Sequence, residues 1–186
     1  MQQRKFPSTL PRLSFVLGGA ASGKSDIAER LLARIEGPRL YLATAQGLDA
    51  EMRDKIAAHR AARGENWLTQ EVPQTLPDAI RAAPAGHAVL ADCLTMWLSN
   101  LILAERDPDP QFAALAQAIR AAPGPLVLVS NEVGAGIVPD TALGRRFRNA
   151  QGRLNRIVAA EADAVIGVMA GLPFALKGRL PREVDA

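Results

Sequence analysis

Short, unbroken runs of apolar residues alternate along the chain with longer stretches in which apolar residues recur every three or four positions. The unbroken runs predict buried strands at residues 13–17, 40–43, 88–92, 126–129 and 164–169. The periodic stretches predict helices at residues 24–36, 49–63, 96–102, 112–121 and 141–162. Strands buried on both faces that alternate with helices are typical of a mostly parallel sheet with helices on both faces. We therefore expect an α/β fold that binds its ligands at the carboxyl ends of the strands.

The composition supports a single domain with a substantial core, because 48% of the 186 residues are hydrophobic and no repeat or low-complexity linker divides them. We expect a flexible N-terminal leader at 1–12 and one domain at 13–186. A net charge of +3 does not indicate nucleic-acid binding, and the apolar runs are too short to cross a bilayer. Cys93 is the only cysteine, which excludes an intrachain disulfide framework and a cysteine-rich zinc site and favours a cytoplasmic location.

A glycine-rich motif lies between the first predicted strand and the first predicted helix. It fits the pattern G-x-x-x-x-G-K-[ST] with the strand and helix that this pattern requires, and it predicts a P-loop NTPase-like fold that binds a nucleoside triphosphate. Successive backbone N–H groups of such a loop surround a phosphate, and the helix N-terminus adds partial positive charge. Lys24 is expected to reach the β- and γ-phosphates, and Ser25 to ligate Mg²⁺. The residues of the loop are Gly18, Gly19, Ala20, Ala21, Ser22, Gly23, Lys24 and Ser25.

Two acidic residues follow apolar strands and are candidates for chemistry beside this loop. Asp92 ends the predicted strand at 88–92, the position from which a carboxylate reaches the Mg²⁺ of a bound nucleotide. Glu132 follows the strand at 126–129. It either orients a water or hydroxyl as a base, or it caps the loop that follows.

The chain has two histidines, His59 and His87. On the predicted helix at 49–63, Lys55 and Arg63 lie one turn from His59, and such cations favour the neutral, nucleophilic imidazole. A histidine that faces solvent is the simpler interpretation from chemistry alone. His87 is interpreted as a turn residue before a strand.

The predicted helix at 141–162 carries an apolar stripe and a separate arc of basic and polar side chains. The arc is either a solvated face or a phosphate-recognising surface, since guanidinium groups match phosphate oxygens. The stripe comprises Leu143, Phe147, Ala150, Leu154, Ile157 and Val158, and the arc comprises Arg145, Arg146, Asn149, Arg153 and Arg156.

Taken together, these motifs resemble one family closely: the bifunctional adenosylcobinamide kinase / adenosylcobinamide-phosphate guanylyltransferase of cobalamin biosynthesis. The resemblance covers roughly residues 13–177, and its motifs are far more specific than the phosphate loop alone. The stretches that carry it lie at 18–25, 41–45, 51–71, 92–101, 130–139 and 147–155.

The resemblance implies two successive reactions. A nucleoside triphosphate (ATP or GTP) phosphorylates the aminopropanol hydroxyl of adenosylcobinamide, and GTP then delivers GMP to that phosphate, giving adenosyl-GDP-cobinamide and pyrophosphate. It also implies a GMP–histidine intermediate at His59 and a homo-oligomer, a trimer. By the same matching, the guanine nucleotide contacts Thr44, Ala45, Gln46, Arg60, Ala61, Ala62, Arg63, Glu71 and Asp92.

The chemistry implied for these residues is coherent. A neutral imidazole at His59 attacks the α-phosphorus, while Mg²⁺ and Lys24 absorb charge on the departing pyrophosphate. His59 and Lys24 are thus the expected catalytic residues and Ser25 and Asp92 the expected metal ligands. Arginines of 145–156 are expected to assist the cobinamide phosphate.

Two positions depart from the family pattern: Ala21 stands where members usually carry arginine, and Asp92 where some carry glutamate. The first departure bears on the nucleotide preference and rate of the kinase step. Two other interpretations remain open. One is a small-molecule kinase with a phosphate loop and no covalent histidine, and the other is a nucleotide-gated interaction module, for which a guanine motif or exposed apolar switch segments would be expected.

Overall fold

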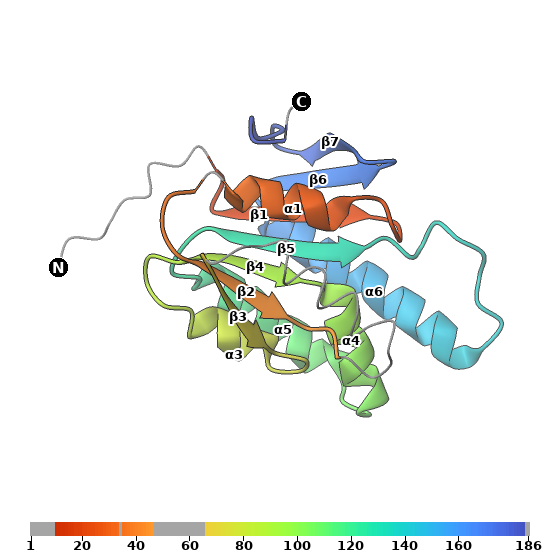
Figure 1. Ribbon diagram of the computed structural model, residues 1–186. Coiled ribbons are helices and arrows are strands. Elements are labelled where there is room, and N and C mark those ends of the chain that lie inside the picture. The colour runs from red at the N-terminus through yellow and green to blue at the C-terminus, as the bar shows by residue number, and fades with distance from the viewer. Residues whose placement is uncertain (1–9, 34, 47–65, 185–186) are drawn as a thin grey trace.

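The core of the molecule is a seven-stranded sheet with the strand order β3-β2-β4-β5-β1-β6-β7 (Figure 1). The computed structural model describes residues 10–33, 35–46 and 66–184. All neighbouring strands are parallel except β6 and β7, which pair in antiparallel orientation. The strands are β1 (Leu13–Gly18), β2 (Arg39–Ala43), β3 (Trp67–Glu71), β4 (Ala88–Asp92), β5 (Leu126–Asn131), β6 (Ala164–Met169) and β7 (Leu172–Lys177).

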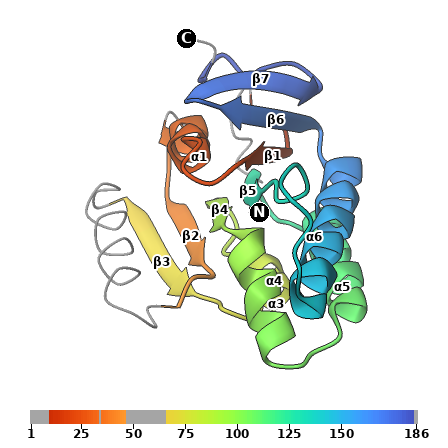
Figure 2. The ribbon, with the colours of Figure 1, turned by 90° about the vertical axis from the view of Figure 1, so that its right-hand side faces the viewer.

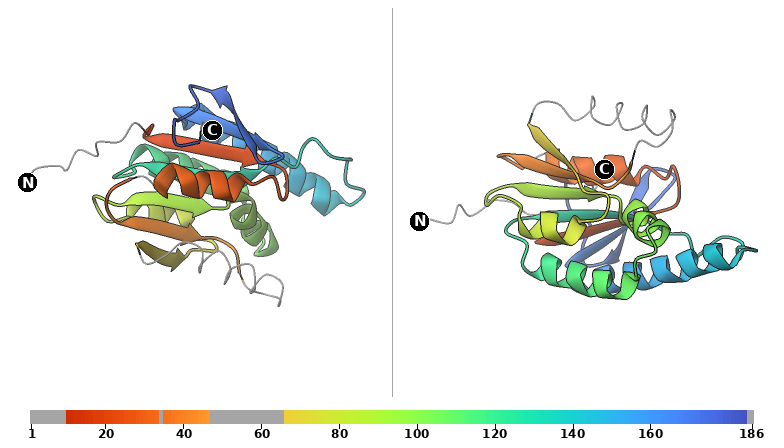
Figure 3. Two further views of the ribbon diagram at one scale, coloured as in Figure 1. Left: turned by 45° about the horizontal axis from the view of Figure 1, so that its top comes forward. Right: turned by 90° about the horizontal axis from the view of Figure 1, so that it is seen from below.

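Helices cover both faces of the sheet, as Figures 2 and 3 show in end-on and edge-on views. Among the described helices, α1 (Lys24–Ala33) lies on one face and four lie on the other. These four are α3 (Leu76–Arg81), α4 (Leu94–Leu103), α5 (Pro108–Arg120) and α6 (Ala142–Glu161).

Each face of the sheet has its own hydrophobic core, and alternate residues of one strand contribute to each. In β5, Val127 and Val129 pack in the core that contains Ile27 and Leu31 of α1. Leu128, which lies between them, packs in the core that α4, α5 and α6 share. Burial on both faces explains why the central strands read as unbroken apolar runs.

The structure confirms the predicted strands and those predicted helices that fall within the described residues. The helix expected at 112–121 begins earlier, at Pro108, because Asp107 caps it by accepting a hydrogen bond from the Asp109 N–H at 3.1 Å. The helix expected to begin near Asp140 or Thr141 is capped by Thr141, whose hydroxyl accepts from the Gly144 N–H at 3.1 Å.

Three elements were missed by the pattern, and each has a physical reason. β3 and β7 are the two edges of the sheet, so their apolar residues are fewer or partly exposed, and Pro173 within β7 argues against a strand in sequence terms. α3 spans only 6 residues, too few to show helical periodicity.

Other expectations lie wholly or partly outside the described residues. The helix predicted at 49–63 and residues 1–9 of the expected leader belong to this group. Within 10–33, 35–46 and 66–184, the helices are too short or too polar for any of them to cross a membrane.

Candidate active site

The phosphate loop joins β1 to α1 at the carboxyl edge of the sheet, where β1 lies between β5 and β6. The Ser22 N–H donates to the Gly19 carbonyl at 3.4 Å, and the Ile27 N–H donates to the Gly23 carbonyl at 3.1 Å as α1 begins. The Lys24 side chain is buried, and its Nζ donates to the Gly19 carbonyl at 3.0 Å. The loop backbone therefore holds the lysine charge within the loop itself.

Two glycines of the motif are required by close packing. A Cβ on Gly18 would lie 2.3 Å from Ser22 Oγ and 2.7 Å from the Val168 carbonyl oxygen, so a side chain does not fit there. Gly23 has a φ of +87°, and a Cβ there would lie 3.3 Å from Gly171 Cα. Gly171, in the turn between β6 and β7, also donates its N–H to the Ser22 carbonyl at 2.9 Å. The turn between β6 and β7 thus supports the phosphate loop from one side.

Ala21 and Ser22 at the tip of the loop have unusual features. Ala21 is exposed and has a φ of 54°, a left-handed conformation that is uncommon for a residue with a Cβ. The Ser22 hydroxyl is buried, and its Oγ has no hydrogen-bond partner within the described part of the chain.

Asp92 ends β4 on the face of the sheet that α1 covers, because Leu90, two residues earlier, packs in the α1 core. The pKa of the next residue, Cys93, depends on the charges around it. Burial raises the pKa of the Cys93 thiol to about 11, the Asp92 carboxylate adds to the rise, and Lys24 acts in the opposite direction. Asp92 and Lys24 therefore both lie close enough to Cys93 at the carboxyl edge to affect its pKa.

Thr44 has a structural role that the sequence did not indicate. Its side chain is fully buried, and its hydroxyl accepts from the Cys93 N–H at 2.8 Å and donates to the Cys93 carbonyl at 2.7 Å. Asn100 of α4 donates to the Thr44 carbonyl at 2.8 Å and to the Pro73 carbonyl at 2.9 Å. These bonds fasten the ends of β2, β3 and β4 together and occupy the Thr44 side chain.

The other predicted nucleotide contacts lie along the same edge or outside the described residues. Ala45 is half-buried and Gln46 is exposed just beyond β2, and Glu71 is exposed at the end of β3. Because β3 is four strands from β1, Glu71 lies roughly 19 Å from the phosphate loop at the usual strand spacing. His59, Arg60, Ala61, Ala62 and Arg63 lie outside the described residues.

Glu132 begins the connection from β5 to α6. Its N–H donates to the Gly18 carbonyl at 3.0 Å, which fixes it beside the phosphate loop. Its carboxylate is exposed and accepts a hydrogen bond from the Gly134 N–H. The side chain therefore caps the connection, which agrees with one of the two roles expected for it.

Three arginines of α6 bind other parts of the protein. Arg145 donates to the Asp140 carbonyl at 2.6 Å, Arg148 donates to the carbonyls of Gly134 and Gly136, and Arg153 pairs with Asp109. The bonds of Arg145 and Arg148 hold the 132–141 connection against the first turns of α6, which extend beyond the sheet at the right of Figure 1. The Arg153–Asp109 pair joins α6 to the start of α5.

The prediction of an apolar stripe on α6 is wrong at the N-terminal end of the helix. Leu143 is 54% exposed, because the first turn of α6 lies beyond the edge of the sheet. Further along, the polar residues Gln151 and Asn155 are buried on the stripe between the apolar residues.

Gln151 and Asn155 form a buried polar cluster with the end of β5 and the start of α4, and this cluster was not predicted from the sequence. Gln151 Nε2 donates to Ser130 Oγ and to Asn155 Oδ1, both at 2.9 Å. Ser130 Oγ donates to Asn155 Oδ1 at 2.8 Å, and Thr95 Oγ1 lies 3.4 Å from Ser130 Oγ. The available signal was the spacing of Gln151 and Asn155, which places two polar residues one turn apart on an otherwise apolar face.

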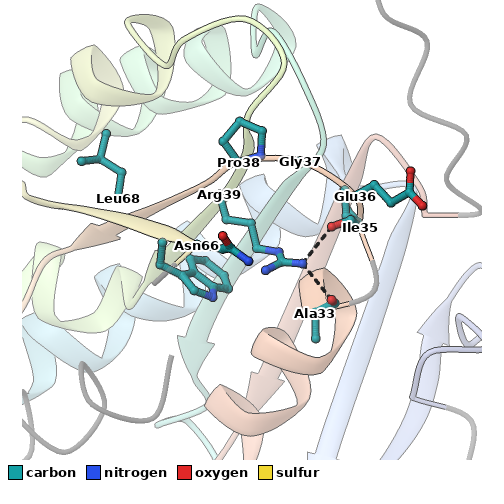
Figure 4. A pocket seen from close by; sticks show the side chains of 9 residues that line it. Ala33, Ile35, Glu36, Gly37, Pro38, Arg39, Asn66 and Leu68 are labelled. Carbon is teal, nitrogen blue, oxygen red and sulfur yellow. Dashed lines mark hydrogen bonds between the residues drawn. The ribbon is translucent and has the colours of Figure 1, made fainter. Parts of the chain in front are cut away.

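A surface pocket also lies at the opposite, amino edge of the sheet, between the end of α1 and the starts of β2 and β3 (Figure 4). Arg39 crosses it and donates to the carbonyls of Leu32, Ala33 and Ile35 at 2.8 Å each, which caps the C-terminus of α1. The Arg39 guanidinium therefore stabilises the end of α1, and the pocket lies away from the phosphate loop. His87, which is half-buried, lies at the same edge in the turn before β4, as expected.

The sequence matches a family model over most of its length. The model, CobU, is described as cobinamide kinase / cobinamide phosphate guanyltransferase, and it matches residues 14–176. The chain is 46% identical over 167 residues to the bifunctional adenosylcobalamin biosynthesis protein CobP of Pseudomonas aeruginosa. The matched region covers 88% of this chain and 96% of that protein. The chain is also 40% identical over 178 residues to the bifunctional adenosylcobalamin biosynthesis protein CobU of Escherichia coli. That match covers 87% of this chain and 98% of the E. coli protein.

Solved structures resemble the chain in fold. One is a prototypical ATPase from the type III secretion system of pathogenic bacteria, with a TM-score of 0.53 and 14% identity over 86% of this chain. Another is the ATPase EscN of enteropathogenic E. coli in complex with its central stalk EscO, with a TM-score of 0.51 and 14% identity over 90% of this chain. The chain spans 51% and 44% of those two ATPase chains. At this identity the likeness shows the fold alone, and it confirms the predicted α/β fold of P-loop ATPases.

Proposed function

Because the chain belongs to the cobinamide kinase / cobinamide phosphate guanyltransferase family, we propose that it catalyses both reactions of that name in cobalamin biosynthesis. A nucleoside triphosphate phosphorylates adenosylcobinamide, and GTP then transfers GMP to the new phosphate to give adenosyl-GDP-cobinamide. The observation that carries this proposal is the family match over residues 14–176, within which lies an intact phosphate loop.

The nucleotide is proposed to lie along the carboxyl edge of the sheet. Its phosphates occupy the loop Gly18–Ser25, and the guanine nucleotide of the second reaction contacts Ala45, Gln46, residues 60–63 and the two acids Glu71 and Asp92. Thr44, which is buried and bonded to Cys93, holds Ala45 and Gln46 in place and makes no contact of its own. The position of Glu71 on β3, several strands from β1, suits contact with the end of the nucleotide that lies furthest from its phosphates.

The residues at this edge also suit Mg²⁺. Ser25 in the first turn of α1 and Asp92 at the end of β4 supply a hydroxyl and a carboxylate, the hard oxygen ligands that Mg²⁺ prefers. When bound there, the ion neutralises negative charge on the phosphates.

In the guanylyl transfer, His59 is proposed to carry the nucleotide. A ring nitrogen of the neutral imidazole attacks the α-phosphorus of GTP, the bond from that phosphorus to the pyrophosphate oxygen breaks, and pyrophosphate leaves. A phosphate oxygen of adenosylcobinamide phosphate then attacks the same phosphorus, the nitrogen–phosphorus bond breaks, and the imidazole is restored. Lys24 stabilises the charge that develops on the departing pyrophosphate.

We also propose that the enzyme assembles as a homotrimer and works in the cytoplasm, where its nucleotide substrates are. The family resemblance implies the number three, and the exposed edge strand β7 supports association between chains. Its alternate residues Leu172, Phe174 and Leu176 are 71%, 44% and 58% exposed, which is unusual for a free surface.

Labelling with [α-³²P]GTP tests the covalent step. The wild-type protein is expected to retain label that is released by acid and survives base, as a nitrogen–phosphorus bond does. His59→Ala should lose at least 99% of this label and of GMP transfer, and it should keep most of the phosphorylation of adenosylcobinamide.

The second histidine provides a matched control. His87 lies at the opposite edge of the sheet, so His87→Ala should label like the wild type. Guanylyl transfer that persists in His59→Ala would overturn the covalent role. Phosphorylation without any labelling of the wild type would indicate a kinase with a phosphate loop and no covalent histidine.

A further inference from the structure

Asn131, the last residue of β5, has no role in the activity proposed above. We propose that Asn131 is a further catalytic residue of the phosphorylation step, whose carboxamide oxygen accepts a hydrogen bond from the alcohol that attacks the γ-phosphate. This inference rests on the proposed function and assigns a residue to its first reaction.

The strand order places Asn131 between the phosphate loop and Asp92. β5 lies between β1, which leads into the phosphate loop, and β4, which ends at Asp92. In register, Asn131 is opposite Gly18, the first residue of the loop, and Asp92 is opposite Val129. Asn131 therefore ends β5 directly beside the start of the loop.

The alternation of side chains places the Asn131 carboxamide on the nucleotide face of the sheet. Val127 and Val129 pack in the core beneath α1, whereas the Ser130 hydroxyl bonds to Gln151 and Asn155 of α6 on the other face. Residue 131 therefore turns back to the α1 face, on which the phosphate loop and Asp92 also lie.

The backbone of Asn131 is held on both sides. Its N–H donates to Thr95 Oγ1 at 2.8 Å, and its carbonyl accepts from Asn155 Nδ2 at 3.1 Å. Its side-chain oxygen is different: Asn131 Oδ1 is buried and has no hydrogen-bond partner within the described part of the chain. A buried amide oxygen without a partner is unfavourable, and a hydrogen-bond donor on a ligand would satisfy it.

The position of Lys24 indicates which phosphate lies nearest. Lys24 Nζ bonds to the carbonyl of Gly19, the residue after the one opposite Asn131, and a lysine of this motif reaches the β- and γ-phosphates. Asn131 therefore lies beside the part of the loop that serves the β- and γ-phosphates, away from the α-phosphate. A residue there bears on transfer of the γ-phosphoryl group more than on attack at the α-phosphorus.

The proposed role concerns orientation and involves no proton transfer to the amide. The alcohol oxygen attacks the γ-phosphorus, the bond from that phosphorus to the bridging oxygen breaks, and the nucleoside diphosphate leaves with the bond electrons. The hydroxyl proton is released to solvent. Asn131 Oδ1 accepts a hydrogen bond from the attacking hydroxyl. This bond orients the alcohol so that a lone pair of the alcohol oxygen points at the γ-phosphorus.

Two variants test the proposal in the full chain, with adenosylcobinamide and ATP or GTP as substrates. Asn131→Ala is expected to lower kcat for phosphorylation by about 100-fold, because the alcohol is no longer oriented. The KM for the nucleotide and the labelling by [α-³²P]GTP should stay within about threefold of wild type, since the loop and Lys24 are unchanged. Asn131→Asp keeps an acceptor oxygen, so its kcat should exceed that of Asn131→Ala while repulsion raises its KM for the nucleotide.

Asn66→Ala is the matched control, because Asn66 is exposed at the amino edge of the sheet (Figure 4), and it should phosphorylate at the wild-type rate. A kcat for Asn131→Ala within threefold of wild type would overturn the catalytic role. Equal losses in phosphorylation and in labelling would also overturn it, because they would show a purely structural residue. A wild-type protein that labels with GTP and does not phosphorylate adenosylcobinamide would instead refute the proposed kinase activity, and this role with it.

Discussion

The single cysteine of the chain lies next to the charged residues of the proposed site, and they affect the pKa of its thiol. Cys93 follows Asp92 directly, and its backbone is bonded on both sides by the Thr44 hydroxyl. Its thiol is only partly accessible, and burial together with the nearby carboxylate raises its pKa to about 11. The thiol is therefore neutral at physiological pH.

We expect Cys93 to resist alkylation near neutral pH. At pH 8, a thiol of pKa about 11 reacts on the order of 100-fold more slowly than an ordinary cysteine of pKa about 8.5, because the thiolate is the nucleophile. The rate should rise about tenfold per pH unit until the pH approaches 11. Mass spectrometry after iodoacetamide treatment measures this directly, with a short cysteine peptide as the reference. A rate equal to that of the peptide at pH 8 would contradict the raised pKa.

At the residue scale, the sequence could predict those parts of the site that have a fixed spacing. The phosphate loop and Asp92 were found because each follows an apolar strand that the pattern marks. Asn131 and Ser130 were not assigned roles, since their functions depend on which face of β5 each side chain takes and on which strand lies beside it. Thr44 was expected to contact the nucleotide through its place in a motif, and its burial against Cys93 arises from contacts between distant segments.

At the element scale, α6 and β5 are joined by polar contacts in an otherwise apolar interface. Asn155 is the centre of that junction: it accepts hydrogen bonds from Ser130 and Gln151 and donates one to the Asn131 carbonyl. A buried network of this kind specifies how a helix and a strand align, because each member loses its partners if the helix shifts. Helical periodicity predicted α6 and could place two polar side chains on its apolar face, but it could not show which groups of β5 they would bind.

Removal of the Asn155 amide should destabilise the protein measurably. Asn155→Ala leaves the Ser130 hydroxyl and the Asn131 carbonyl short of partners, so the free energy of unfolding should fall by about 2–3 kcal/mol in urea denaturation. Asn149→Ala makes the same substitution at an exposed position of the same helix and should stay within about 0.5 kcal/mol of wild type. Equal stability of the two variants would show that the buried network contributes nothing.

At the scale of the whole molecule, the fold class followed from the alternation of apolar strands with helices. The strand order did not, because it depends on pairing between segments far apart in the chain. β1 pairs with β5 and β6, and β5 separates β1 from β4, so the loop, Asn131 and Asp92 meet only in the assembled sheet. The edges were the least predictable part, since β3 and β7 lack the uniform burial that produces a clear pattern.

The exposed apolar residues of β7 lead to a prediction about assembly. The wild type should have the mass of three chains of 19.8 kDa each in light scattering coupled to gel filtration. A double variant, Leu172→Glu with Leu176→Glu, should run as a single chain, because charges on an edge strand oppose association. Leu103→Glu alters a leucine that is 67% exposed at the end of α4 and should leave the mass unchanged. A monomeric wild type would refute the trimer, and a trimeric double variant would place its interface elsewhere.

The strand order also determines when the protein can begin to bind a nucleotide during its synthesis. Leu13 pairs with Leu126 and Ser14 with Ala164, so β1 leaves the ribosome long before either neighbour exists. Until then the nascent chain carries an apolar strand with both hydrogen-bonding edges open, a species that chaperones commonly shield. Contacts so distant along the chain slow folding, so the phosphate loop should acquire its final shape among the last parts of the molecule.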